Sequence, residues 1–265
     1  MNITHTRLMG ALFLGALFIC GGFISINQST VNDPDQTQAE SIEGAWELTQ
    51  IRGESTEAMA IRMVKILSDG NFMFAFFNDE TQQFFSAGGG KYTYKDGMYT
   101  EMIEFHTITP SIIGKKVKFN AEFKNDKWYH TGTVEGEPLN EVFRRIDKGK
   151  GKEHVGAWEI FRLSNDAGKM VPQQKNLETM KLLSGTRFQW ATWNSKKGDF
   201  VGTGGGTYTI EDGYYTENIE FFSPDSLRVG QSITFGCEIK GGTWHHEEYA
   251  GSRGLPINEI WVKVE

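Results

Sequence analysis

The feature of this 265-residue chain that most constrains its fold is an internal duplication. GAWEL at residues 44–48 returns as GAWEI at residues 156–160. GGGKYTYKDGMYTEMIEF at residues 88–105 returns as GGGTYTIEDGYYTENIEF at residues 204–221, with 13 of 18 positions identical. The separation between the copies grows from 112 to 116 residues and reaches 118 at the closing strand, which short loop insertions explain. A repeat of this length, in a preserved order, indicates two tandem copies of one domain.

The N-terminal segment has the pattern of a targeting sequence. A short head with Arg7 precedes an uncharged run over residues 8–26, whose length sits at the overlap between a signal-peptide core and a membrane-spanning helix. Residues 1–26 are therefore predicted to be a cleaved signal peptide or an uncleaved N-terminal membrane anchor, and both interpretations stay open. Either one predicts an exported protein that is periplasmic, secreted or membrane-anchored on the outer side of the inner membrane. A lipoprotein is not expected, because Ile19 precedes Cys20 where a lipobox has a small residue.

Each copy has the pattern of short strands joined by tight turns. Turn dipeptides such as Asp69-Gly70 and Asp96-Gly97 supply the positive φ angles of two-residue hairpins. In the first copy we predict strands at residues 46–52, 63–67, 72–77, 84–94, 98–106, 115–124, 127–134 and 140–146. Successive hairpins form an antiparallel meander, and about eight such strands are best closed into a small barrel, which removes the exposed edges. The prediction is an all-β fold of two tandem up-and-down barrels.

The domain boundaries follow from the repeat and from local composition. We assign residues 27–41 to a polar spacer, 42–147 to the first barrel, 148–153 to a basic linker, and 154–265 to the second barrel. The least strand-like stretches, residues 53–62 and 165–177, are predicted to form a short helix or a lid over one barrel mouth.

Composition excludes several functional classes. A net charge of −7 argues against a nucleic-acid partner, whose binding proteins are basic. Two cysteines are too few for a disulfide scaffold or a cysteine zinc cluster. The Gly-Gly-Gly segments are not phosphate loops, because strand residues rather than a helix start follow them, so we expect bulges or tight barrel corners there.

The recurring motifs resemble those of the lipocalin-like, calycin-type domains. They are G-x-W-x-[LI] at the start of each copy, G-G-G-x-Y-T-x-x-D-G-x-Y-T-E-x-I-E-F, a tryptophan strand, and a closing N-E-x-[FW] strand. The chain looks most like the exported bacterial group described as membrane or secreted proteins of unknown function. The resemblance implies a small barrel with an interior ligand site, and it carries over no catalytic residues.

Strand alternation places specific side chains inside the barrels. Tyr99, Glu101, Ile103 and Phe105 share one face, which is predicted to point inward because most of it is apolar. The candidate interior ligand-binding residues are Tyr99, Glu101, Trp128, Glu141, Phe143 and Arg145 in the first copy, and Tyr215, Glu217, Trp244, Glu259, Trp261 and Lys263 in the second. A buried carboxylate needs a partner, so we expect a polar cluster such as Glu101 with Arg145 and Tyr99.

Three interpretations of such a cluster stay open. It recognises a small ligand, it is an internal network that fixes the shape of the barrel, or its carboxylates catalyse a reaction such as glycoside hydrolysis. No metal site is expected, because His245 and His246 point to opposite faces of a strand, and no cofactor is expected. We expect an exported, non-enzymatic protein that binds a small lipophilic or amphipathic ligand. The alternatives are a structural module of the cell envelope with side-chain-filled barrels and an envelope enzyme that uses an inward glutamate. A membrane contact is expected only through an uncleaved N-terminus.

Overall fold

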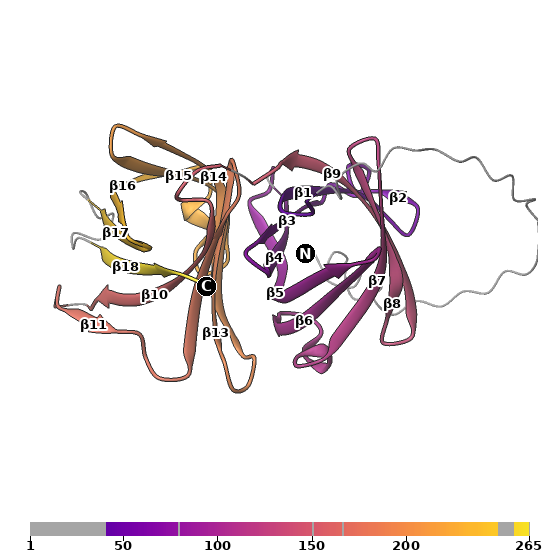
Figure 1. The fold of residues 1–265 in the computed structure, drawn as a ribbon, viewed down its shortest axis with the longest axis horizontal. Coiled ribbons are helices and arrows are strands. Elements are labelled where there is room, and N and C mark those ends of the chain that lie inside the picture. The colour runs from indigo at the N-terminus through magenta and orange to yellow at the C-terminus, as the bar shows by residue number, and fades with distance from the viewer. Residues whose placement is uncertain (1–40, 79, 150, 166, 249–256, 265) are drawn as a thin grey trace, which may run out of the picture.

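The computed structural model describes residues 41–264 except 79, 150, 166 and 249–256, and it is built almost entirely of antiparallel strands. The predicted signal or anchor at residues 1–26 lies outside the described residues. Two barrels stand side by side along the long axis of the molecule (Figure 1). Within the described residues, no helix has the length and apolar character needed to cross a membrane.

Barrel 1 is one sheet in which every strand pairs with its sequence neighbours, apart from the short β2, which pairs only with β1 at the edge. Its strands are β1 (Gly44–Ile51), β2 (Glu54–Ser55), β3 (Arg62–Ser68), β4 (Asn71–Asn78), β5 (Gln83–Lys95), β6 (Met98–His106), β7 (Lys116–Lys124), β8 (Lys127–Val134) and β9 (Glu137–Asp147). Pairing of β1 with β9 closes the barrel. The eight predicted strands are confirmed to within a few residues, and the hairpin residues Asp69 and Asp96 have the expected positive φ.

Barrel 2 repeats this topology and is closed by pairing of β10 with β18. Its strands are β10 (Gly156–Ser164), β11 (Met170–Pro172), β12 (Leu177–Leu183), β13 (Arg187–Asn194), β14 (Phe200–Glu211), β15 (Tyr214–Phe222), β16 (Ser232–Lys240), β17 (Thr243–Glu248) and β18 (Asn258–Lys263). Two short 3-10 helices lie in equivalent connections of the two barrels. η1 (Pro110–Ile112) lies between β6 and β7, and η2 (Ser226–Arg228) lies between β15 and β16. The stretches predicted as a short helix or a lid contain turns and the short strands β2 and β11, so the helix is wrong for their described residues.

A β-bulge in β6 corrects one prediction. Gly90 pairs with Ile103 and Gly89 pairs with Phe105, so Glu104 is an extra residue and the strand changes face there. Phe105 therefore points out of the barrel and not inward as predicted, and His106 lines the interior in its place. Gly90 permits the bulge because it has φ +152° and a Cβ there would lie 2.1 Å from the Met102 carbonyl oxygen.

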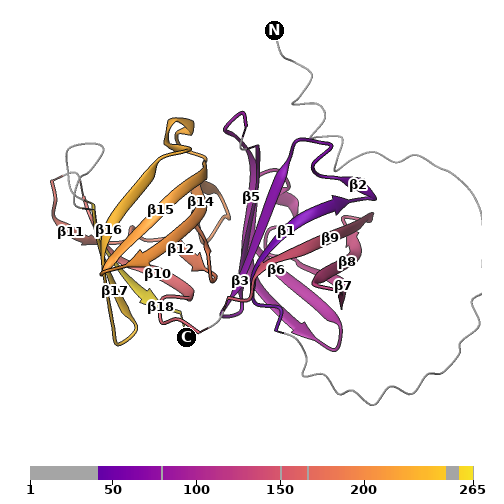
Figure 2. The same cartoon turned by 90° about the horizontal axis from the view of Figure 1, so that it is seen from above.

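The same bulge in β15 turns Phe221 outward and brings Phe222 inward. The outward phenylalanines build a second hydrophobic core between the barrels, where β3, β4 and β5 face β12, β13 and β15 (Figure 2). Phe105 stacks on Trp193 with ring centroids 4.9 Å apart, and Phe77 lies 4.9 Å from Phe221.

This interface has approximate two-fold symmetry. Trp193 is the repeat counterpart of Phe77, and Phe221 is the counterpart of Phe105, so the two ring pairs exchange when the barrels are swapped. Phe84 stacks on its own counterpart, Phe200, with centroids 6.3 Å apart. The two copies thus pack as the subunits of a symmetric dimer do, through one surface used twice.

Polar contacts at the rim of the interface fix how the barrels are oriented. The Asp147 carboxylate, at the end of β9, accepts hydrogen bonds from the backbone N–H of Gly185 and of Thr186 and from the Ser184 hydroxyl. Asp69 likewise accepts from the backbone N–H of Ala157 at 2.9 Å. These bonds hold the ends of the linker against both barrels.

Replacing Trp193 with alanine tests the weight of this interface. Trp193 is 2% exposed, and loss of a buried tryptophan typically costs about 3–5 kcal/mol of unfolding free energy. We expect W193A to lower the midpoint of urea unfolding strongly, whereas F161A, at a residue that is 56% exposed, shifts the free energy by less than about 0.5 kcal/mol. Equal effects of the two substitutions would contradict the prediction that burial of Trp193 between the barrels stabilises the fold.

Candidate functional site

A buried ion pair lies at the centre of each barrel. In barrel 1, Lys65 Nζ on β3 donates to Glu101 Oε1 on β6 at 2.9 Å, and both side chains are buried. In barrel 2, Lys181 on β12 and Glu217 on β15 form the same pair at 2.9 Å. Each charge is stabilised by its partner because neither reaches bulk water.

Aromatic rings surround both ammonium groups. Lys65 Nζ lies 5.2–5.8 Å from the ring centroids of Phe72, Phe74, Tyr99, Trp128 and Phe143. Lys181 Nζ lies 4.9–5.3 Å from those of Tyr215, Trp244 and Trp261. The negative faces of such rings attract a cation, which offsets part of the cost of removing it from water.

A histidine–glutamate pair completes each cluster. His130 Nδ1 lies 2.8 Å from Glu141 Oε2, and His246 Nδ1 lies 3.0 Å from Glu259 Oε2. Burial lowers the pKa of both histidines, so each imidazole is neutral at pH 7. Burial opposes ionisation of Glu259, but the His246 hydrogen bond and the Lys181 charge outweigh it and hold the pKa of this carboxyl below its usual value. The imidazole N–H therefore donates to a carboxylate.

Most of the predicted interior residues are gathered in these clusters. Tyr99, Glu101, Trp128, Glu141 and Phe143 lie inside barrel 1, and Tyr215, Glu217, Trp244, Glu259 and Trp261 lie inside barrel 2. Burial raises the pKa of the Tyr99 and Tyr215 hydroxyls well above the usual value, and the neighbouring glutamates Glu101 and Glu217 raise it further.

Arg145 and Lys263 lie elsewhere, at one end of each barrel. The Arg145 guanidinium stacks over the Trp46 ring at 4.0 Å and donates to the backbone oxygens of Ser41 and Glu43. Lys263 similarly donates to the backbone oxygens of Glu153 and Val155. The partner of Glu101 is Lys65 and not the expected Arg145.

Both buried lysines are absent from the candidate residues predicted from the sequence. The signal was present: Lys65 lies between Met63 and Leu67 on one face of β3, and the repeat places Lys181 in the same position of β12. A lysine that occurs in both copies on an apolar face is expected to be buried with a partner.

The two barrel interiors differ in size. Barrel 1 holds a cavity of about 50 Å³, whereas that of barrel 2 is about 260 Å³. The larger cavity has Lys181, Glu217, His246 and Glu259 at its polar end. Its apolar walls comprise Ile160, Leu163, Trp190, Phe222, Ile233, Phe235, Ile257 and Trp261.

Two positions on neighbouring strands explain much of the difference. Met63 lies opposite Phe76 in barrel 1 and fills the space, whereas their counterparts in barrel 2, Thr179 and Thr192, are small and polar. The two threonine hydroxyls lie 2.8 Å apart, and Gln173 Nε2 donates to Thr179 Oγ1 at 2.7 Å. Barrel 2 therefore has a hydrogen-bonding group where barrel 1 has a hydrophobic plug.

An outer hollow of about 420 Å³ adjoins the barrel 2 cavity. The two spaces share Leu163, Gln173, Thr179 and Thr192 as lining residues.

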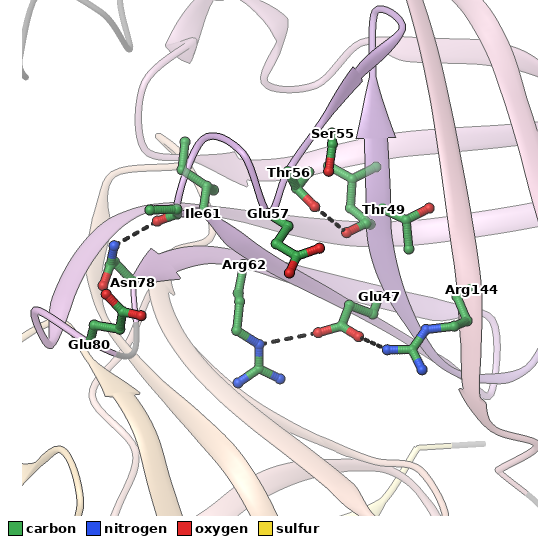
Figure 3. Close-up of a pocket in the computed structure, with 12 residues that line it drawn as sticks. Glu47, Thr49, Ser55, Thr56, Glu57, Ile61, Arg62, Asn78, Glu80 and Arg144 are labelled. Carbon is green, nitrogen blue, oxygen red and sulfur yellow. Dashed lines mark hydrogen bonds and ion pairs between the residues drawn. The ribbon is translucent and has the colours of Figure 1, made fainter.

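A crevice of about 400 Å³ on the outside of barrel 1 is a weaker candidate. Glu47 lies between Arg62 and Arg144 there and accepts a hydrogen bond from each, as Figure 3 shows. Arg62 also contacts Glu220 of barrel 2 at 3.4 Å. Both arginines are already paired with carboxylates. Their role in the crevice is therefore to stabilise the fold rather than to bind a ligand.

Comparison with family models gives a match over the first copy of the repeat. A family model described as "Domain of unknown function (DUF4488)" matches residues 41–152, which span barrel 1. No curated protein matches the chain.

Among solved structures, the uncharacterized protein YLR301w from Saccharomyces cerevisiae matches with a TM-score of 0.45 and 11% identity, over 84% of this chain and 98% of that one. Two mutants of transferrin binding protein B from Haemophilus parasuis Hp5 match with TM-scores of 0.24 and 0.23 and identities of 11% and 9%. The matches cover 77% and 75% of this chain, which spans about half of each of those proteins, 54% and 52%.

Substitution of Lys65 tests the buried pair. K65M leaves the Glu101 charge buried and unpaired, which is expected to cost about 3–5 kcal/mol of unfolding free energy. K65M/E101M removes both charges, so urea unfolding should show most of that loss recovered. A double variant no more stable than K65M would contradict the account.

Acidification tests the buried histidines. Burial lowers the pKa of His106 from 6.5 to about 4, and its Nδ1 accepts hydrogen bonds from the backbone N–H of Ile108 and Thr109. Below pH 6.5 the unfolded chain binds a proton that the folded chain does not, so unfolding free energy is expected to fall as the pH drops toward 4. H106F carries the barrel 2 residue, and its unfolding free energy should fall less over that range. An unchanged pH dependence in H106F would exclude His106 as a source.

Proposed function

We propose that the protein is an exported binding protein that holds a small amphipathic ligand inside barrel 2, while barrel 1 is its filled structural partner. The observation that carries this proposal is the contrast between Met63 with Phe76 and Thr179 with Thr192 at equivalent positions. One copy of a duplicated barrel is filled by large side chains, and the other is open at the same place.

The chemistry of the cavity supports an amphipathic occupant. Apolar walls favour a hydrocarbon or aromatic body through the hydrophobic effect, and a few polar groups at defined places orient the ligand. The volume of about 260 Å³ lies just below the usual range of roughly 300–1,000 Å³ for drug-sized ligands. We therefore propose a small ligand, part of which extends into the outer hollow.

The polar end supports binding rather than catalysis. Glu217 is bound to Lys181, and Glu259 accepts hydrogen bonds from His246 and from Trp261 Nε1. Because the pKa of Glu259 is held low, this carboxyl carries no proton to donate at neutral pH. The same cluster occurs in barrel 1 without a comparable cavity, which supports a structural role for it in both copies.

The amino-acid pattern of residues 1–26 supports export of this binding protein. A cleaved product would be free in the compartment beyond the membrane, and an uncleaved one would be tethered to it. The spacer at residues 27–41 would then separate the barrels from the membrane.

Exchange of the plug between the barrels tests the proposal. T179M/T192F gives barrel 2 the residues of barrel 1, and we expect it to lose at least about tenfold in affinity for ligands found by thermal-shift screening or native mass spectrometry. The reason is that the two large side chains occupy the volume of the ligand body.

The reciprocal variant M63T/F76T is the control. It is expected to destabilise barrel 1 by opening its core and to leave ligand affinity unchanged. Full affinity in a folded T179M/T192F variant would overturn the proposal, because the ligand would then bind outside barrel 2.

A further inference from the structure

We propose that the ligand of barrel 2 is an amphipathic anion, with its charged group at Arg228 on the cavity rim and its apolar body inside. This inference deepens the proposed function and rests on it.

Arg228 occupies a position that the repeat makes informative. It ends η2, and its counterpart Ile112 ends η1, where it is 5% exposed and packs into the barrel 1 core. Replacement of a buried isoleucine by arginine exchanges an apolar plug for a cation at the edge of the cavity. Arg228 is half-buried and lines that cavity together with Phe222.

The Arg228 guanidinium has N–H donors that are available to a ligand. Its carbon lies 5.8 Å from the Phe222 ring centroid, and among the described residues its N–H groups have no hydrogen-bond acceptor. Among the described residues, no carboxylate forms an ion pair with it. A planar guanidinium of this kind suits a carboxylate or another oxyanion, which it can bind through two parallel hydrogen bonds.

The opposite end of the cavity disfavours an anion. There the charges of Lys181 and Glu217 cancel, and Glu259 is ionised beside a neutral His246. The deep end therefore carries about one net negative charge, which repels an anionic group in a medium of low dielectric constant. Attraction at the rim and repulsion at the deep end together orient the ligand with its charge outward.

The walls between these ends fit an apolar body. Trp190, Phe222, Ile233 and Phe235 line the space, and Thr179 and Thr192 line both the cavity and the outer hollow. An alkyl or aromatic acid places its apolar atoms against these side chains and pairs its anion with Arg228.

Three probes that differ only in the head group test the inference. Isothermal titration calorimetry of the full chain would compare sodium octanoate, 1-octanol and octylammonium chloride. We expect octanoate to bind about tenfold or more tightly than octanol, because a hydrogen-bonded ion pair adds roughly 1.5–3 kcal/mol. Octylammonium should bind most weakly.

Two variants that each remove one positive charge separate a specific effect of Arg228 from a general effect of charge. R228Q should reduce octanoate affinity to that of octanol and leave octanol unchanged. K240Q, at an exposed end of β16, should leave all three affinities as in the natural chain. Circular dichroism and unfolding midpoints establish that each variant is folded.

The outcomes separate the two proposals. Equal binding of octanoate and octanol, stronger binding of octylammonium, or parallel loss of octanoate and octanol in R228Q would each overturn the anion inference. In those cases, if T179M/T192F still abolishes octanol binding, the barrel 2 cavity stands as a binding site. Octanoate binding that survives T179M/T192F would overturn both.

Discussion

Each barrel is organised around a lysine ammonium that has been removed from water. Lys65 and Lys181 are stable there because a glutamate lies 2.9 Å away and aromatic rings surround the charge. A buried charge without its partner is far more costly than the pair, so the strands that carry the two groups must keep their register. The large interior tryptophans and tyrosines pack on this pair, and the histidine–glutamate pair lies beside it.

A single extra residue in β6 and β15 connects the barrel interior to the arrangement of the two copies. The bulge at Glu104 sends Phe105 outward, and the equivalent bulge at Glu220 does the same to Phe221. These rings form the core between the barrels. One backbone irregularity, which glycine permits, therefore has two effects. It places His106 or Phe222 in the barrel interior, and it forms the surface through which the barrels pack.

The two copies keep the same scaffold and differ at the interface between the barrels and at several interior positions. At the interface, Arg62 pairs with Glu220, but the repeat counterpart of Arg62 is Glu178. Burial raises the pKa of the Glu104 carboxyl, and the charge of Glu178 raises it further. Inside, Met63, Phe76 and Ile112 of barrel 1 correspond to Thr179, Thr192 and Arg228 of barrel 2. All of these changes leave the ion-pair cluster intact, which is consistent with a structural cluster and a site formed by variation around it.

The sequence alone was sufficient for the fold class, the repeat and nearly every strand, because hairpin dipeptides and side-chain alternation are local signals. It also placed Tyr99, Glu101 and Trp128 inside. It could not locate Phe105, because a bulge inverts alternation without changing composition, and it misassigned the partner of Glu101, because Lys65 lies 36 residues away and only barrel closure brings the two together. Whether an interior is filled or hollow depends on how side chains from several strands pack in three dimensions, so the tertiary structure alone distinguished barrel 2 from barrel 1.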